Sequence, residues 1–321
     1  MKKRFIFCAC LAFAVSAPVC AQTYPSRPVM LIVPAPAGGP TDIIGRQVGQ
    51  LLTNQMGQNF IVENRSGAGN TLGADYVARS KPDGQTLLIG SPSSHAIAPS
   101  IYPKLPYDPV KDFSPIIMMV TAPLALAIHP SVPAVTLKEF IALAKSRPGQ
   151  LNFASGGSGT TSHLTGEYFK LAAGVKIVHV PYKGSGQATT DLMTGQIQMM
   201  FIGVHSSIPL IQAGKLRSLG VTSKKRSELV PDLPTLEEAG LKGFHVTTWY
   251  GLLGPAGLPR PIVSALNDAV TKGMKDAAMR QRLAAQGFEI VTGTPEQFGS
   301  ELAKEVETWG KVVKQSGAKI D

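Results

Sequence analysis

The chain has 321 residues, a formal net charge of +10 and 44% hydrophobic residues. This length allows two domains of ordinary size, each with its own core. The basic residues are scattered apart from Lys224-Lys225-Arg226, which we interpret as a solvated loop. No aromatic and basic residues alternate as they do on nucleic-acid-binding surfaces, so we exclude a nucleic-acid partner.

The N-terminal residues 1–21 predict a secretory signal peptide. Positive residues 2–4 precede an apolar run at 5–15 that is too short to span a bilayer. Small residues and a proline follow and lead to a cleavage site after Ala21. The alternative is a buried N-terminal helix, which the charged start and the small residues disfavour. We therefore expect export to the periplasm.

All three cysteines, Cys8, Cys10 and Cys20, lie inside this segment. The mature chain would then have no disulfide, no thiolate metal site and no cysteine nucleophile. Cys20 would carry a lipid anchor in an alternative interpretation, but the residues before it fit that processing pattern poorly. We predict neither a metal site nor a cofactor.

The mature chain alternates short apolar runs with amphipathic segments, which is typical of βα units and a largely parallel sheet. We expect Gly57, Gly195 and Gly214 to end helices in the left-handed conformation. The predicted strands are 29–33, 60–62, 86–89, 124–128, 151–154, 177–180, 197–201 and 216–221. The predicted helices are 43–56, 71–78, 137–144, 164–171, 188–193, 208–213, 262–274, 277–286 and 295–316, the last one with Thr294 as its N-cap.

Two groups of βα units and a helical C-terminal part predict two α/β lobes between which the chain crosses twice. We place the crossings near Thr121-Ala122 and Val246-Thr247. Lobe 1 would comprise 22–121 and 248–321, and lobe 2 would comprise 122–247.

Loops rich in Gly, Ser and Thr follow several predicted strands and open the next helix. They lie at 37–42, 91–95, 155–163 and 181–186. The first N–H groups of a helix lack partners within the helix, and the helix dipole places positive charge there, so such a start binds anions without a lysine. Each loop alone is equally well explained as an ordinary cap or turn. Together, with two in each lobe, they favour a ligand cleft.

Enzyme motifs are missing from the sequence. There is no Walker loop and no Gly-x-Ser-x-Gly elbow, and 67–73 is better explained as a glycine-rich helix start than as a dinucleotide site. The six histidines show no metal-ligand spacing, and we interpret His163 and His179 as structural. Asp42 is the acid in a glycine-rich loop, where we expect it to cap the helix. A secreted hydrolase remains the alternative from another class, but no nucleophile–base pair is recognisable.

Short motifs in a fixed order carry a family resemblance over nearly the whole mature chain. The chain resembles the periplasmic receptors of tripartite tricarboxylate transporters, also called the Bug family. The motifs are Tyr24-Pro25-Ser26-Arg27-Pro28, the loop Pro34–Asp42, Val62-Glu63-Asn64-Arg65 with Gly67-Ala68-Gly69, Lys81-Pro82-Asp83-Gly84, Tyr102-Pro103-Lys104-Leu105-Pro106-Tyr107-Asp108-Pro109, Val180-Pro181-Tyr182-Lys183-Gly184, Gly214-Lys215-Leu216-Arg217 and Pro231-Asp232-Leu233-Pro234-Thr235.

The resemblance implies a two-lobed Venus-flytrap fold of the type II kind with two crossing strands. It implies an organic or aromatic carboxylate as ligand, held by loop backbone groups, hydroxyls and water. It also implies delivery to the membrane subunits of a tripartite transporter, and we expect a monomer. Ligand presentation to a membrane sensor is an alternative that shares the same fold and site. The implied binding residues are Ala37, Gly38 and Gly39 in lobe 1 and Ser155, Gly159, Thr160 and Thr161 in lobe 2, with Ser93 and Ser94 as further candidates.

The chain departs from the family pattern at two positions that bear on the ligand. Ala35 replaces a bulkier residue, and Ile202 stands where many members carry an acid. Both changes make the predicted pocket more apolar, and we count Ile202 among the binding residues. Because a buried ammonium group needs an anionic partner, we expect a carboxylate ligand without an amino group.

Overall fold

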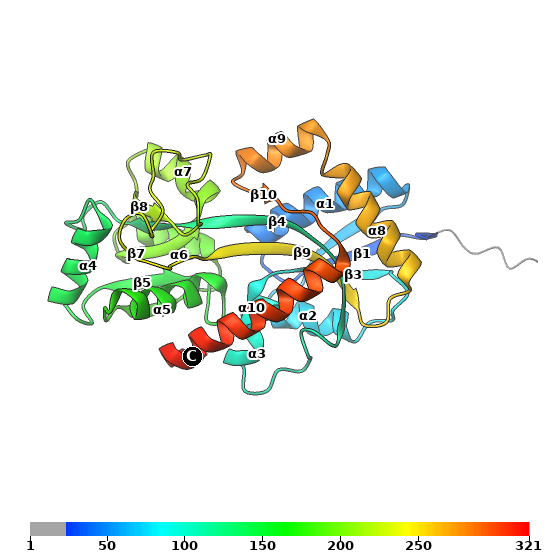
Figure 1. Ribbon diagram of the computed structural model, residues 1–321, viewed down its shortest axis with the longest axis horizontal. Helices are drawn as coiled ribbons and strands as arrows, with labels where there is room; N and C mark the ends of the chain where they lie inside the picture. The colour runs from blue at the N-terminus through cyan, green and yellow to red at the C-terminus, as the bar shows by residue number, and fades with distance from the viewer. Residues whose placement is uncertain (1–23, 321) are drawn as a thin grey trace, which may run out of the picture.

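The computed structural model describes residues 24–320, so the predicted signal peptide lies outside the described residues. The chain forms two α/β lobes side by side along the long axis of the molecule, and two long strands run through both of them (Figure 1). Within residues 24–320, none of the helices combines the length and the apolar character that crossing a membrane requires.

Lobe 1 is built on a sheet with the strand order β2-β1-β3-β9-β4, and β10 pairs with β4. Strands β1, β2 and β3 are parallel, whereas β9 is antiparallel to β3. Its elements are β1 (Val29–Val33), α1 (Pro40–Met56), β2 (Phe60–Asn64), η1 (Ala68–Asn70), α2 (Thr71–Ala78), β3 (Thr86–Gly90), the π-helical turn η2 (Ser93–Ile97), α3 (Ala98–Ile101), α8 (Arg260–Gly273), α9 (Ala277–Ala285) and β10 (Glu289–Ile290).

Lobe 2 has a sheet in which β4 pairs with both β7 and β8, and the order continues from β7 to β5 and β6. Strands β5, β6 and β7 are parallel, so the loops after them open on one edge of the sheet. Its elements are α4 (Leu137–Ser146), β5 (Asn152–Ser155), α5 (Thr161–Ala173), β6 (Val178–Pro181), α6 (Ser185–Met193), β7 (Met199–Gly203), α7 (Val204–Gln212) and β8 (Arg217–Val221).

The lobes are joined by β4 (Phe113–Ile128) and β9 (Thr247–Pro255), which pair antiparallel from Phe113–Pro255 to Pro123–Thr247. From Leu124 onward β4 changes its partners to the strands of lobe 2. The sequence predicted only the 124–128 part of β4. The first half of β4 was not predicted, because register shifts after Pro115 and Met118 break the alternation of buried and exposed residues.

The last helix, α10 (Pro295–Ser316), contacts both lobes. Thr294 caps it as predicted, accepting a hydrogen bond from the N–H of Gln297. Near its start, Phe298 packs in a lobe 1 cluster, whereas Trp309 belongs to the large cluster that contains the lobe 2 core. The expected division at 121/122 and 247/248 assigns α10 to lobe 1 alone, and this division stays a prediction.

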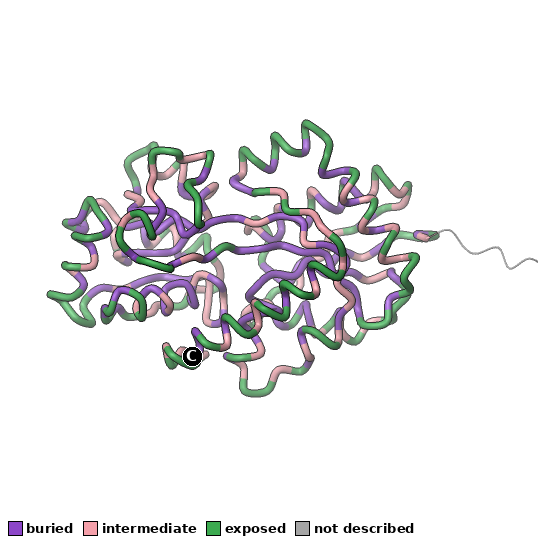
Figure 2. The backbone as a smooth tube through the Cα atoms, viewed as in Figure 1, coloured by how far each residue is buried: buried purple, intermediate pink, exposed green. Residues whose placement is uncertain are grey.

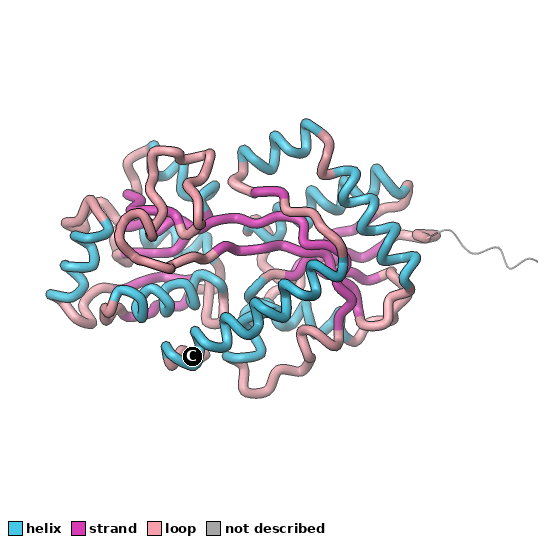
Figure 3. Tube along the Cα trace, viewed as in Figure 1, coloured by secondary structure: helices cyan, strands magenta, loops and turns pink. Residues whose placement is uncertain are grey.

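Burial explains why these segments adopt these structures. Strand β1 is a β-branched and aliphatic run whose Val29, Leu31 and Val33 are fully buried, and α1 packs onto the same cluster through Ile44 and Val48. Figure 2 shows buried residues along the central strands and exposed ones on the outer faces of the helices, and Figure 3 shows the strands running through the middle of the molecule. The sheets therefore hold the loops at their strand ends in place.

Candidate functional site

A cavity of about 700 Å³ lies between the two lobes. The loops after β1, β3, β5, β6 and β7 form much of its lining. The crossing strands contribute the rest through Ala122 and Leu124 of β4 and through Thr248 and Tyr250 of β9. Because Ala122 and Thr248 are paired residues, these side chains share one face of the strand pair. The loops at the carboxyl ends of the strands in both sheets thus meet beside the crossing strands.

Several helix N-termini converge on this cavity. The starts of α1, α5, α6 and α7, with N-caps Gly39, Thr160, Gly184 and Gly203, all contribute lining residues. Each places the positive end of a helix dipole at the cavity, with N–H groups that lack partners within the helix. The arrangement produces a positive potential that suits an anion, although Lys183 is the one lining residue with a formal charge among those described.

The loop before α1 is held in shape by Asp42. Its Oδ2 accepts hydrogen bonds from the Gly38 N–H at 2.9 Å and from Arg46 Nε at 3.0 Å, and its Oδ1 accepts from Asn64 at 2.9 Å. Burial raises the pKa of this carboxyl, but the bonds from Arg46, Gly38 and Asn64 outweigh it and hold the pKa below its usual value. Asp42 therefore stabilises the loop from behind, as a capping acid would, and does not line the cavity.

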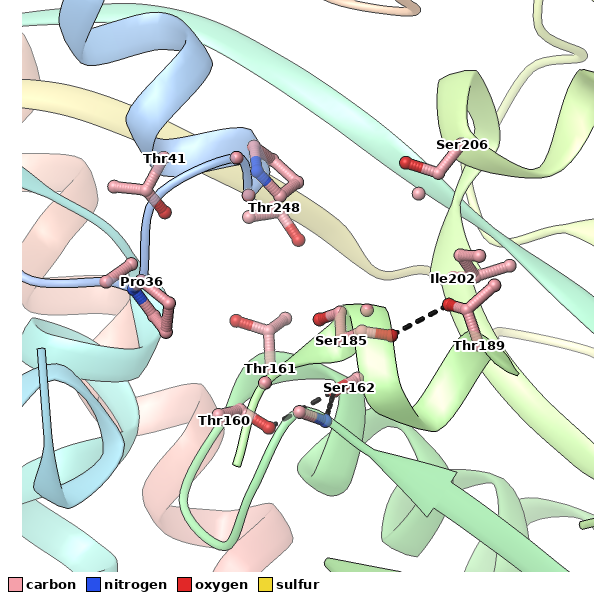
Figure 4. A pocket seen from close by; sticks show the side chains of 18 of the residues that line it. Pro36, Thr41, Thr160, Thr161, Ser162, Ser185, Thr189, Ile202, Ser206 and Thr248 are labelled. Atoms are coloured by element: carbon pink, nitrogen blue, oxygen red, sulfur yellow. Dashed lines mark hydrogen bonds between the residues drawn. The ribbon is translucent and has the colours of Figure 1, made fainter. Parts of the chain in front are cut away.

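The loop before α5 is ordered by its own hydroxyls and by a residue of lobe 1. Thr160 Oγ1 donates to the Gly157 carbonyl at 2.7 Å and caps α5 through the His163 N–H. The Thr161 N–H donates to Ser93 Oγ across the lobes at 3.1 Å. The hydroxyl of Ser162 is engaged by the Gly156 N–H at 3.2 Å (Figure 4).

The structure brings most of the predicted residues to the cavity but not all. Lining residues are Ala37, Gly38, Gly39, Ser93, Thr160, Thr161 and Ile202, whereas Ser94, Ser155 and Gly159 do not line it. Ser94 is fully buried and bonds the Ser91 carbonyl and His95. Ser155 Oγ lies 2.6 Å from His179 Nε2, and the Gly159 N–H donates to His163 Nδ1 at 3.1 Å. These three residues support the loops from behind.

Sequence reasoning missed a further set of lining residues with hydroxyl groups. Figure 4 shows Thr41, Thr248 and Ser206 around the same central space as Thr161 and Ser185. Ser185 could have been predicted from the 181–186 loop by the rule that selected the other loops. Thr248 could not, because nothing local marks a residue of a crossing strand as part of the site.

Ser91 is the missed residue with the clearest chemical signature. Its side chain is 3% exposed and lines the cavity at the end of β3, yet Oγ has no hydrogen-bond partner among the described residues. A buried hydroxyl without a partner costs about 1–3 kcal/mol. Such a group in a cavity wall is well placed to bind a polar ligand atom.

One end of the cavity is apolar and lies in lobe 2. Ile202, Met193, Met200 and Leu210 line it, and Ile202 lies beside Thr189 in Figure 4. None of the lining residues that the structure describes is an aspartate or glutamate. The cavity thus combines an anion-binding region with an apolar wall and offers no carboxylate to a cation.

The structure also contains serine–histidine pairs that the sequence did not reveal. Ser155–His179 and Ser94–His95 are shielded from the cavity, whereas Ser206 Oγ lies 2.8 Å from His205 Nε2 at the cavity wall. Burial lowers the pKa of His205 to about 4, and its Nδ1 meets no partner within the described chain. A weakly basic imidazole without an orienting group is a poor general base, so the geometry of this pair does not favour a hydrolase.

Comparison with known proteins gives a consistent result. A family model described as "Tripartite tricarboxylate transporter family receptor" matches residues 44–318. The chain is 37% identical to "Protein BugT" of Bordetella pertussis over 307 residues, which covers 95% of this chain and 94% of BugT.

Similar solved structures share the fold. One, described as R. palustris Rpa4515 with adipate, has a TM-score of 0.88 and 35% identity and covers 93% of this chain and 100% of that one. Another, MatC (Rpa3494) from Rhodopseudomonas palustris with bound malate, has a TM-score of 0.85 and 34% identity, covering 90% and 100%. These likenesses confirm the two-lobed binding-protein fold that the sequence predicted.

Proposed function

Because this chain belongs to the tripartite tricarboxylate transporter receptor family, we propose that it captures a small organic carboxylate between its lobes and delivers it to the membrane subunits of such a transporter. Receptors of this family bind solutes and are not enzymes. The observation that carries the proposal is the convergence of several helix N-termini on one interlobe cavity. Adipate and malate, bound by similar receptors, support the same ligand chemistry.

The ligand carries no amino group. An ammonium taken out of water requires an anionic partner, and the described lining residues contain no carboxylate. Asp42, the nearest acid in sequence to the lining glycines, is already bonded to Arg46, Asn64 and Gly38. Ile202 and its apolar neighbours favour a hydrocarbon or aromatic portion on the ligand.

The carboxylate group binds at the helix starts. Gly39 and Thr41 offer backbone N–H groups that meet no acceptor in the part of the chain the structure describes. The hydroxyl groups of Ser91 and Thr41 add donors around the same space. Ala37, Gly38, Ser93, Thr160 and Thr161 complete the wall, with Ser94, Ser155 and Gly159 supporting the loops.

The receptor acts as a monomer outside the cytoplasm. The composition of residues 1–21 supports export and cleavage after Ala21. N-terminal sequencing of protein secreted to the periplasm tests this, and Gln22 is expected as the first residue.

A thermal-shift screen tests the ligand class. It compares succinate, adipate, malate and benzoate with glutamate and aspartate. At least one acid without an amino group should raise the melting temperature, because a ligand that binds only the folded state stabilises it by mass action. Stabilisation by an amino acid alone would refute the argument from Ile202. A protein that retains no acid in native mass spectrometry and responds to none of these compounds would contradict the carboxylate assignment.

A further inference from the structure

The loop before α5 has a second face, which points away from the cavity and meets lobe 1. Gly159 on this face has a left-handed φ of +80°, and Gly69 of lobe 1 has a φ of +60°. The side chain of Tyr102, just after α3, lies against both glycines. A Cβ added at Gly159 would come within 3.2 Å of its ring and hydroxyl, and one at Gly69 would lie 2.6 Å from the hydroxyl.

Further contacts between the lobes surround this tyrosine. A Cβ at Gly69 would also lie 3.1 Å from the Ser158 carbonyl of lobe 2. Nearby, Ser93 Oγ accepts the Thr161 N–H and lies 3.2 Å from Thr161 Oγ1. We call Gly69, Ser93 and Tyr102 of lobe 1, with Gly159 and Thr161 of lobe 2, the closure seam.

Tyr102 is held in position from its other side. It packs against the large buried cluster that contains Ile101 of lobe 1, Phe169 of lobe 2 and Trp309 of α10. This packing restricts the movement of the ring, so a side chain at position 159 would meet Tyr102 at a closer distance than most Cβ contacts.

We propose that Tyr102 is a positioning residue for closure of the lobes. When the lobes meet, the backbones of Gly69 and Gly159, which carry no side chains, pack against its ring. In this arrangement Gly159 serves the closure of the cleft rather than the ligand, since its N–H is bonded to His163. The contact brings Thr160 and Thr161 to their places at the cavity as the lobes close.

The test is Gly159→Asn with Gly174→Asn as the matched control. Asparagine tolerates left-handed backbone angles, so both changes carry similar backbone strain. Gly174 ends α5 in the same lobe with a φ of +62° and has open space around it. Only at position 159 would the new side chain collide with Tyr102.

The measurement is a spin-label distance between exposed Gln212→Cys on α7 and Arg280→Cys on α9, which lie on opposite lobes. Residues 22–321 contain no native cysteine to interfere. Distances are recorded without ligand and with succinate, adipate, malate or benzoate. We expect the population at the interlobe distance of the present structure, in which the seam contacts are made, to fall about tenfold in Gly159→Asn, or about 1.4 kcal/mol. Gly174→Asn should retain it, whereas Tyr102→Ala, which removes the ring that both glycines contact, should lower it.

The proposed role of the closure seam would be refuted if Gly159→Asn kept the population at this interlobe distance, or if Gly174→Asn lost it to the same extent. A wild-type protein with no closed population under any of these conditions would refute it as well. Failure of the carboxylate assignment is distinguished by the thermal-shift screen, which does not depend on the spin labels.

Discussion

Ser91 and Ser94 lie three residues apart on the same loop, yet their hydroxyl groups have different surroundings. Ser94 accepts a hydrogen bond from the Ser91 N–H at 3.3 Å and lies 2.8 Å from His95 Nδ1. Ser91 lines the cavity, and its Oγ is buried without a partner among the described residues. The Ser94 hydroxyl is used within the fold, whereas that of Ser91 has no partner among the described residues.

At the scale of the residue, Ser91→Ala should weaken binding and spare the fold. A hydrogen bond to a charged group contributes about 1.5–3 kcal/mol, so affinity should fall about tenfold or more. The melting temperature of the unliganded protein should stay level or rise, because a buried unpaired hydroxyl is removed. Calorimetry with the best acid of the screen and a thermal melt measure both effects.

Ser94→Ala is the control for this prediction. It leaves the Ser91 N–H without its acceptor and should lower the stability of the unliganded protein. If Ser91→Ala bound the acid as tightly as the wild type, Ser91 would not be a ligand residue.

At the scale of the element, two threonine-capped helices have different roles. Thr160 caps α5 at the cavity, and Thr294 caps α10 away from it. Each threonine accepts a backbone N–H three residues later in the chain. The same local interaction therefore occurs both inside the site and outside it.

Replacing either threonine by valine should cost about 1 kcal/mol of stability through loss of the cap. The melting temperature should fall by about 2–4 °C in both variants. Only Thr160→Val should also weaken acid binding, because it displaces the N–H groups at the start of α5. Equal affinities of the two variants in calorimetry would show that the start of α5 does not hold the ligand.

At the scale of the whole molecule, buried histidines couple stability to pH. Burial lowers the pKa of His95 to about 3 and that of His205 to about 4, both from 6.5. His95 is fully buried among Tyr107, Phe113 and Trp249, and its Nε2 has no partner within the described residues. Its charged form is therefore excluded from the folded protein.

The free energy of unfolding should fall as the pH drops below 6.5, the ordinary pKa of both histidines. Well above pH 6.5 neither state is protonated at these sites. Between 6.5 and the lowered values, the unfolded chain binds a proton that the folded chain does not. Each histidine then contributes a slope approaching about 1.4 kcal/mol per pH unit.

Urea denaturation between pH 6.5 and about 5 measures this slope before most carboxyl groups titrate. His95→Gln should reduce this slope by up to the contribution of one proton, about 1.4 kcal/mol per pH unit, whatever its effect on the absolute stability. An unchanged slope in His95→Gln would mean that His95 does not exclude the proton.

Elements with complete local signals were predictable from sequence. The β-branched run Val29–Val33, the helix Thr71–Ala78 and the helix Pro295–Ser316 with its threonine cap have the predicted bounds. Gly57 ends α1 in the left-handed conformation as expected. In each case the chain near the element contains the β propensity, the helical periodicity or the end signal that defines it.

What the sequence by itself determined was the strands outside the long crossing pair, the glycine- and hydroxyl-rich helix starts and the membership of a receptor family. Only the tertiary structure decided which N–H and hydroxyl groups at those helix starts have no hydrogen-bond partner within the described chain. Thr161 donates its N–H to Ser93 of the other lobe, Gly159 faces Tyr102, and the Ser91 hydroxyl, unlike that of Ser94, has no partner among the described residues. The reason is physical. Propensities and caps act within a few residues, whereas folding brings together distant residues that determine whether each hydrogen-bond donor has an acceptor.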